Sequence, residues 1–334
     1  MKLKLLIATS DGDYAEHLSD ILSEKYSETF DVSVCSSLDR LKDFSMANKF
    51  DVAIFDQGFA SAANLSPIKL PLVLIDESVG FAEDNAPLKK IRKYQRVSAI
   101  AGNVLENYAE ISQGINNFGA SKARTTAVWS PSGGAGKTTV ALAYAANKIS
   151  SGKHALYLNL ENFSSTSAYF QENGKSISKV FGRPESNVSM LLMGIRQQDS
   201  GSGISYFCGP ENYDDMNILT SDDIETLISA CAADMDEVVI DLSSQCDERV
   251  RKVFEIADAL LIVCDPSTTS QTKLQQFATQ HIVFGQIQAK TVLVNNKGAK
   301  TNQPGIDKTV SLPLLNSADP ISVFKSLSSG NFDW

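Results

Sequence analysis

Apolar and polar residues alternate along this chain in blocks that predict strands followed by helices. Short apolar runs typical of buried strands occur early in the chain, at Leu3–Ala8, Phe30–Cys35, Asp51–Asp56 and Pro71–Asp76. Segments between them carry apolar residues at helical spacing, as at Tyr14, Leu18, Ile21 and Leu22. Strands that alternate with helices of this length predict a parallel sheet covered on both faces.

The same alternation resumes in the second part of the chain. Further strand-like runs lie at Thr125–Trp129, Ala155–Leu160, Ile204–Cys208, Glu237–Leu242, Ala259–Cys264 and Thr291–Asn295. The stretch 113–124 is polar, contains glycine and lacks periodicity, so it predicts a linker. We therefore expect an α/β protein of two domains, residues 1–112 and 125–334, each built on a parallel sheet.

The amino-acid composition argues against several classes of protein. The chain has 334 residues, of which 43% are hydrophobic and 21% charged, as in ordinary globular proteins. No apolar run reaches the roughly 18 residues that a membrane-spanning helix needs, so we expect a cytoplasmic protein. The net charge of −9 argues against a broad nucleic-acid-binding surface. The five cysteines are far apart and lack CxxC spacing, which favours reduced core residues over disulfides or a zinc site.

The strongest chemical signal is a glycine-rich run of eight residues between a strand-like segment and the helical segment Val140–Ile149. Small residues let successive backbone N–H groups turn toward phosphate oxygens at the positive end of a helix. Lys137 can then reach the β- and γ-phosphates, and the Thr138 hydroxyl can ligate Mg²⁺. The run therefore predicts a nucleotide site made of Ser132, Gly133, Gly134, Ala135, Gly136, Lys137, Thr138 and Thr139.

This run resembles the deviant phosphate loop of the MinD/ParA ATPases, K-G-G-x-G-K-T-T. Every position matches except the first, where Ser132 replaces the signature lysine. In that family the lysine crosses a dimer interface to touch the partner's nucleotide. The resemblance implies a homodimer that binds ATP and Mg²⁺, and the missing lysine implies slow hydrolysis.

Other segments fit the same resemblance. Val238–Ser243 predicts a buried strand whose Asp241 is placed to hold the hydration shell of magnesium. Glu161 follows another strand, where it either orients the attacking water or is a surface carboxylate. With Lys137, these two carboxylates are the expected catalytic residues. The later segment Thr291–Lys297 resembles a strand whose asparagine reads adenine, a role that we assign to Asn296, with Asn295 as the alternative.

The first part of the chain resembles a response-regulator receiver domain. Asp56 ends the third strand, where receivers keep their phosphoacceptor, and Lys93 lies near the fifth. Thr9 and Ser10 stand in the places of the acidic pair that holds Mg²⁺ in receivers. Because phosphoryl transfer needs that metal, we expect Asp56 to stay unphosphorylated and the domain to serve in docking or dimerisation.

A receiver-like domain ahead of a MinD-like ATPase is the domain order of the pilus-assembly branch, TadZ and CpaE. The resemblance implies a protein that localises or assembles a Tad/Flp type IV pilus secretion system and is recruited to the cell pole or the secretion machinery. A MinD-type positioning ATPase, one alternative, would need a basic amphipathic helix at the C-terminus, but the tail SVFKSLSSGNFDW has one lysine and contains glycine, so we expect no membrane-targeting helix. A ParA-type DNA-partitioning ATPase, the other alternative, would need a basic stripe. The sequence clusters Lys290, Lys297, Lys300 and Lys308, but we expect them to form a solvated face and not to bind DNA.

Overall fold

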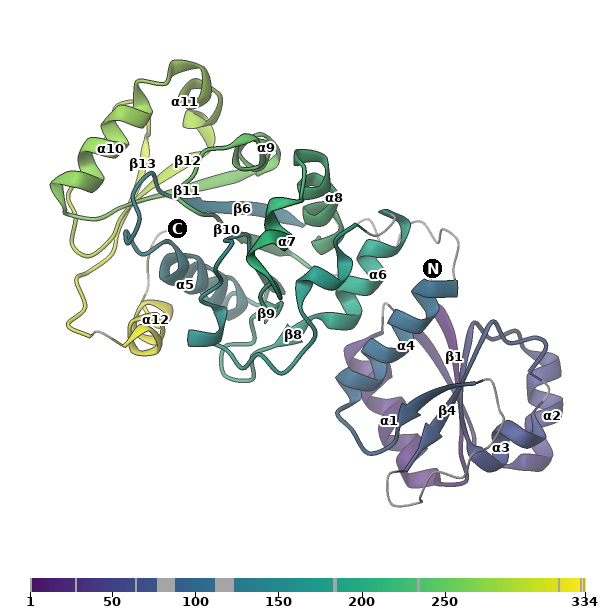
Figure 1. Ribbon diagram of the computed structural model, residues 1–334. Coiled ribbons are helices and arrows are strands. Elements are labelled where there is room, and N and C mark those ends of the chain that lie inside the picture. Colours follow the sequence, from purple (N-terminus) through teal and green to yellow (C-terminus); the bar gives the residue numbers. More distant parts are fainter. Residues whose placement is uncertain are drawn as a thin grey trace. The chain divides into compact units, whose positions relative to one another are not determined.

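A computed structural model describes residues 2–27, 29–63, 65–76, 88–111, 123–182, 185–232, 235–317, 319–330, 332 and 334. The chain forms two compact units (Figure 1). The first unit consists of Met1–Ala120 and Pro184–Gly194, and the second of Ser121–Arg183 and Ile195–Trp334. The expected α/β class and parallel sheets are confirmed. Most of the expected linker, residues 113–122, lies outside the described residues.

The sheet of the first unit is entirely parallel. Its strands run in the order β2-β1-β3-β4-β5, one of the two common orders of doubly wound folds. They are β1 (Leu3–Ala8), β2 (Phe30–Cys35), β3 (Val52–Asp56), β4 (Leu70–Ile75) and β5 (Lys89–Arg92). Because β1 and β3 are neighbours, the residues that follow β1 lie beside Asp56 at the end of β3.

Two layers of helices cover this sheet. They are α1 (Gly12–Lys25), α2 (Leu38–Ala47), α3 (Gln57–Ala62) and α4 (Val97–Ile111). Alternate residues of each strand face opposite layers. Leu5 and Ile54 join the core cluster that contains residues of α1 and α4, whereas Leu6 and Phe55 join a second cluster on the other face.

A helix from later in the chain completes the first unit. Helix α6 (Glu185–Ile195) lies within the range 125–334 expected for the second domain, yet its residues up to Gly194 group with the first unit. Met190 and Met193 are buried in the same core cluster as α4. A Cβ atom built on Gly102 of α4 would overlap the backbone carbonyl oxygen of Gly194. Glycine at both positions therefore allows the two helices to approach closely.

The sheet of the second unit has the order β13-β12-β11-β6-β10-β7-β9-β8. Its strands are parallel except that β8 runs antiparallel to β9. They are β6 (Arg124–Trp129), β7 (Ala155–Asn159), β8 (Gln197–Gln198), β9 (Ser205–Tyr206), β10 (Glu237–Asp241), β11 (Ala259–Cys264), β12 (Thr291–Asn295) and β13 (Lys308–Ser311). The carboxyl ends of β6, β10 and β7 lie side by side. In open α/β sheets, ligands bind at the carboxyl ends of the strands.

Helices α5 and α12 cover one face of this sheet, and α9, α10 and α11 cover the other (Figure 1). Val128 of β6 joins the core beneath α5, whereas Trp129 packs on the opposite face against Phe254 and Phe277. The helices of this unit are α5 (Lys137–Ser150), α7 (Tyr213–Asn217), α8 (Ser221–Cys231), α9 (Glu248–Ile256), α10 (Thr268–Ala278), α11 (His281–Ile287) and α12 (Pro320–Ser328). Among the described residues, no helix is both long enough and apolar enough to cross a bilayer.

Candidate nucleotide site

The glycine-rich run forms the loop between β6 and α5, as the sequence predicted. Gly134 and Gly136 have positive φ angles of 76° and 95°, a conformation that favours glycine. Gly136 is the N-cap of α5, so the loop leads directly into the positive end of that helix. A Cβ atom on Gly136 would also overlap the Asn296 amide. Both the positive φ angle and the close approach of the Asn296 side chain therefore favour glycine at residue 136.

Lys137 lies at the start of α5 and is largely buried. Its Nζ donates to the Ser244 hydroxyl at 3.1 Å and lies 3.7 Å from Oε1 of Glu161. Burial raises the pKa of Glu161, and the ammonium of Lys137 partly opposes that shift. The structure therefore brings together two of the expected catalytic residues and adds Ser244, which no sequence pattern indicated.

Asp241 ends β10 and is fully buried. Its Oδ2 accepts a hydrogen bond from the Tyr157 hydroxyl at 2.8 Å, and the Thr138 side chain lies near enough to the carboxylate to oppose the rise of its pKa. Burial and the nearby charge of Glu161 raise the pKa of Asp241 to about 7. Its Oδ1 is buried without a partner among the described residues. An orphaned carboxylate oxygen beside a threonine hydroxyl fits a magnesium ion with its bound water.

A chain of hydrogen bonds extends from Asp241 to the segment of Glu161. Asn159 donates from Nδ2 to the Tyr157 hydroxyl oxygen at 2.9 Å, and its Oδ1 accepts from the backbone N–H of Glu161 at 2.8 Å. Burial, followed by the charge of Asp241, raises the pKa of Tyr157 well above its ordinary value. Tyr157 was not among the expected site residues, although a tyrosine in an otherwise apolar strand signals a buried hydroxyl that needs a partner.

Asn296 and Lys297 lie against the outer side of the phosphate loop. Asn296 donates from Nδ2 to the Ala135 carbonyl at 2.8 Å and accepts the backbone N–H of Lys297 at 2.9 Å. The Lys297 ammonium donates to the Gly134 carbonyl at 2.7 Å. Asn295 instead forms two hydrogen bonds with the backbone of Thr301. Both asparagine amides thus have partners within the chain, and the adenine-reading role stays a prediction.

Ser132, Gly133 and Thr139 complete the expected loop. Ser132 is buried, and its backbone N–H donates to the Ser130 hydroxyl at 3.1 Å. The hydroxyl of Thr139 shares a hydrogen bond of 3.0 Å with that of Tyr169. Position 132 therefore carries a short buried hydroxyl in place of a long cationic side chain.

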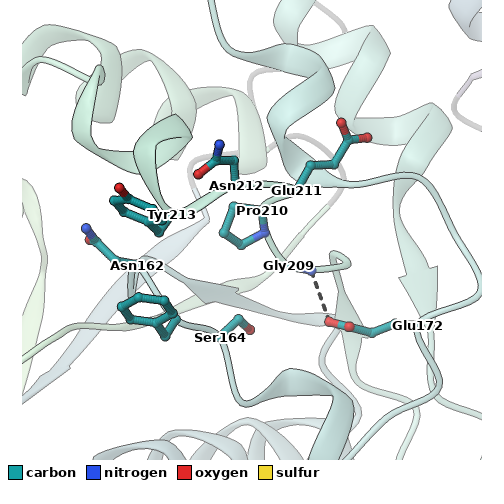
Figure 2. Close-up of a pocket in the computed structure, with 9 residues that line it drawn as sticks. Asn162, Ser164, Glu172, Gly209, Pro210, Glu211, Asn212 and Tyr213 are labelled. Carbon is teal, nitrogen blue, oxygen red and sulfur yellow. Dashed lines mark hydrogen bonds between the residues drawn. The ribbon is translucent and has the colours of Figure 1, made fainter.

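A pocket of about 420 Å³ lies beside the segment that follows Glu161, and it does not include the phosphate loop (Figure 2). The exposed rings of Phe163 and Tyr213 stack at one side with centroids 5.9 Å apart. Glu172 accepts the backbone N–H of Gly209 at 3.0 Å on the other side. The pocket is lined by Asn162, Phe163, Ser164, Glu172, Gly209, Pro210, Glu211, Asn212 and Tyr213. The expected nucleotide site, at the glycine-rich loop, is therefore separate from this pocket.

In the first unit, Asp56 is surrounded by donors. Its Oδ2 accepts from the Thr9 hydroxyl and from the backbone N–H of Ser10. The Lys93 ammonium lies 3.9 Å from the other oxygen of Asp56 and 3.1 Å from Oδ2 of Asp11. The Asp56 carboxylate thus has two hydrogen-bond donors and one shared cation of its own chain around it.

Three of the four lysines considered for a basic stripe bind groups of the chain itself. Lys290 donates to the carbonyls of Glu255 and Ala257, and Lys308 donates to that of Trp334. Lys297 binds the phosphate loop as described above. These contacts place the three ammonium groups against separate parts of the second unit.

No protein-family model matches the chain, and no curated protein matches it. It is similar to the solved structure of a ParA family ATPase from Chlorobium tepidum TLS, with 22% identity over 61% of this chain and 90% of that one, and a TM-score of 0.49. The cell division ATPase MinD of Pyrococcus furiosus has 12% identity over 62% and 97%, with a TM-score of 0.47. Cobyrinic acid a,c-diamide synthase of Mycobacterium smegmatis, solved with an ATP analogue and magnesium, has 16% identity over 62% and 93%, with a TM-score of 0.45. At these values the likeness assigns neither family nor function.

Proposed function

We propose that the second unit binds ATP with magnesium at the loop between β6 and α5. The observation that carries this proposal is the convergence of Lys137, the Thr138 hydroxyl and the orphaned oxygen of Asp241 at the end of that loop. Loop amides and the helix N-terminus favour phosphate oxygens, and the ammonium adds charge for the terminal phosphates. Thr138 and Asp241 would hold the magnesium and its water, and the metal would neutralise charge on the phosphates.

Slow hydrolysis is part of the same proposal. Glu161 lies 3.7 Å from the Lys137 ammonium, where its carboxylate would orient a water molecule near the terminal phosphate. Ser132 offers no cation to a partner's nucleotide. Nucleotide binding, and not hydrolysis, would then drive the function of the protein. Slow hydrolysis would end the ATP-bound state.

Titration calorimetry with ATP, ADP and GTP in the presence of magnesium tests this proposal. We expect adenine nucleotides to bind and Lys137→Ala to weaken ATP binding by about 10- to 100-fold, because a buried charge-assisted contact contributes about 1.5–3 kcal/mol. Lys148→Ala, in the last turn of the same helix, is the matched control and should leave affinity unchanged. Absence of binding by the wild type, or equal affinity for Lys137→Ala, would contradict the proposal, and rapid wild-type turnover would contradict slow hydrolysis.

We further propose that nucleotide-dependent homodimers of this chain localise or assemble a Tad/Flp pilus secretion system. The support is the resemblance to TadZ and CpaE, together with an Asp56 that accepts hydrogen bonds from Thr9 and Ser10, the residues in the places of the acidic pair of receivers. A first unit without the acidic pair that holds Mg²⁺ suits docking better than phosphorylation.

Two measurements address this role. Sedimentation with and without Mg·ATP should show a dimer only with nucleotide. A fluorescently tagged chain should gather at foci in cells that contain the secretion system and spread evenly in cells that lack it. Foci on the nucleoid would favour the DNA-partitioning alternative instead.

A further inference from the structure

Tyr157 connects the buried carboxylate of Asp241 to the end of β7. Only 1% of Tyr157 is exposed, so its hydroxyl must find partners inside the protein. The single phenolic proton goes to Oδ2 of Asp241, and the phenolic oxygen accepts from Asn159. The hydroxyl therefore donates one hydrogen bond and accepts another, and the direction of each bond is fixed.

The direction of these bonds has a consequence for Asp241. With Oδ2 held by the phenol, the carboxylate leaves its other oxygen, Oδ1, without a partner. A carboxylate that is held at one oxygen does not turn freely, so its second oxygen stays available for one ligand. Tyr157 is thus suited to orient Asp241 toward a magnesium-bound water.

Asn159 explains how the phenol keeps its direction. An amide can donate from Nδ2 to the phenolic oxygen while its Oδ1 accepts the backbone N–H of Glu161. An ionised aspartate at this position could still accept from Glu161, but it has no proton to give to Tyr157. The phenol would then be drawn toward two carboxylates with only one proton to share.

We propose that Tyr157 is a positioning residue for the magnesium site and that Asn159 fixes the direction of its hydroxyl. This proposal rests on the proposed binding of Mg·ATP. We expect Tyr157 to affect the gain in nucleotide affinity that magnesium provides. We expect no effect of Tyr157 on the affinity that the loop amides provide without magnesium.

Calorimetry of ATP binding with magnesium and with excess EDTA separates the two parts. Tyr157→Phe keeps the ring and removes only the hydroxyl. We expect it to reduce the gain in affinity from magnesium about tenfold and to leave affinity in EDTA within about twofold of wild type. Tyr144→Phe is the matched control, because Tyr144 also donates to a buried carboxylate, Glu237, at the first residue of β10. It should leave both affinities unchanged.

Asn159→Asp provides a second variant at a less buried position. The substitution adds a negative charge, which by itself attracts a cation, so its effect is measured in both backgrounds. We expect Asn159→Asp to reduce the gain in affinity from magnesium several-fold more in the wild type than in the Tyr157→Phe variant. Only the wild type has a phenolic hydroxyl whose direction the substitution can change.

The possible results are distinguishable. A full magnesium gain in Tyr157→Phe, or equal effects of Asn159→Asp in the two backgrounds, would overturn this inference while leaving nucleotide binding intact. A uniform loss with and without magnesium would identify Tyr157 as merely structural and would also overturn it. If the wild type shows no magnesium-dependent binding, the proposed function fails and the inference fails with it.

Discussion

At the scale of single residues, the sequence located groups whose positions follow from spacing along the chain. Lys137 and Thr138 have fixed offsets in the loop motif, and Asp241 ends an apolar run that had to be a buried strand. Tyr157 and Ser244 escaped prediction because their contacts join separate strands and loops. Tyr157 lies 84 positions from its carboxylate partner, a pairing that periodicity does not encode.

Asp51 provides a residue-scale prediction in the first unit. It accepts hydrogen bonds from the Lys4 backbone N–H at 3.0 Å and from the Lys69 ammonium at 2.8 Å. Burial alone would raise the pKa of Asp51, but these bonds outweigh burial and lower it. Asp51→Asn keeps the shape and removes the charge. Because Lys69 is exposed and partly screened, we expect a loss of about 1 kcal/mol at neutral pH.

The pH dependence of that loss has a definite sign. A lowered pKa in the folded state means that the charged form stabilises the fold at pH values above the unfolded value of 3.8, and that this contribution disappears as pH falls through the folded pKa. The difference in stability between the wild type and Asp51→Asn should therefore begin to shrink below about pH 4 and vanish only below the folded pKa. Urea unfolding followed by circular dichroism measures this, with the exposed Asp31→Asn as control. A gap that stayed constant down to pH 3 would show that charge is not its cause.

At the scale of elements, apolar runs predicted the buried strands closely. Leu3–Ala8, Phe30–Cys35 and Ala259–Cys264 coincide with β1, β2 and β11. β11 is buried along its whole length and β1 everywhere but at Lys4, so apolar runs mark their ends clearly. β2 lies at the edge of its sheet and is buried only at its end residues, Phe30 and Cys35. The partner of α6 was not predictable in the same way. An apolar helix face indicates that a helix is buried but not which sheet it covers.

Gly102 tests the packing of α6 against α4. An alanine methyl at this position would overlap a backbone carbonyl oxygen, which has no rotamer by which to move away. We expect Gly102→Ala to destabilise the first unit by about 2 kcal/mol, in the range of overpacked cores. Gly58→Ala in α3 is the control, since a Cβ there meets nothing within 4 Å and alanine favours helix.

Circular dichroism and tryptophan fluorescence together locate the effect of Gly102→Ala. Both tryptophans, Trp129 and Trp334, belong to the second unit, so fluorescence reports on that unit alone. The substitution should lower the urea midpoint measured by circular dichroism and leave the fluorescence midpoint nearly unchanged. Equal stability of Gly102→Ala and Gly58→Ala would exclude close packing of the two helices.

At the scale of the whole molecule, the sequence predicted an α/β protein with two parallel sheets because strands and helices alternate twice with a polar stretch between them. It did not predict that residues 184–194 would join the first unit. Local patterns assign each segment a type and a buried face. Which core receives a segment depends on shape complementarity between residues far apart in sequence, such as Gly102 and Gly194.

Helix α6 also limits how this gene can exchange parts with others. A recombination event that replaced residues 1–120 alone would bring in a new first sheet and keep Met190 and Met193, side chains shaped for the old one. A transplant that preserves both cores must carry two separate stretches of coding sequence at once. Substitutions in the core of the first unit are therefore expected to be matched by substitutions in α6, although α6 is encoded within the sequence of the second unit.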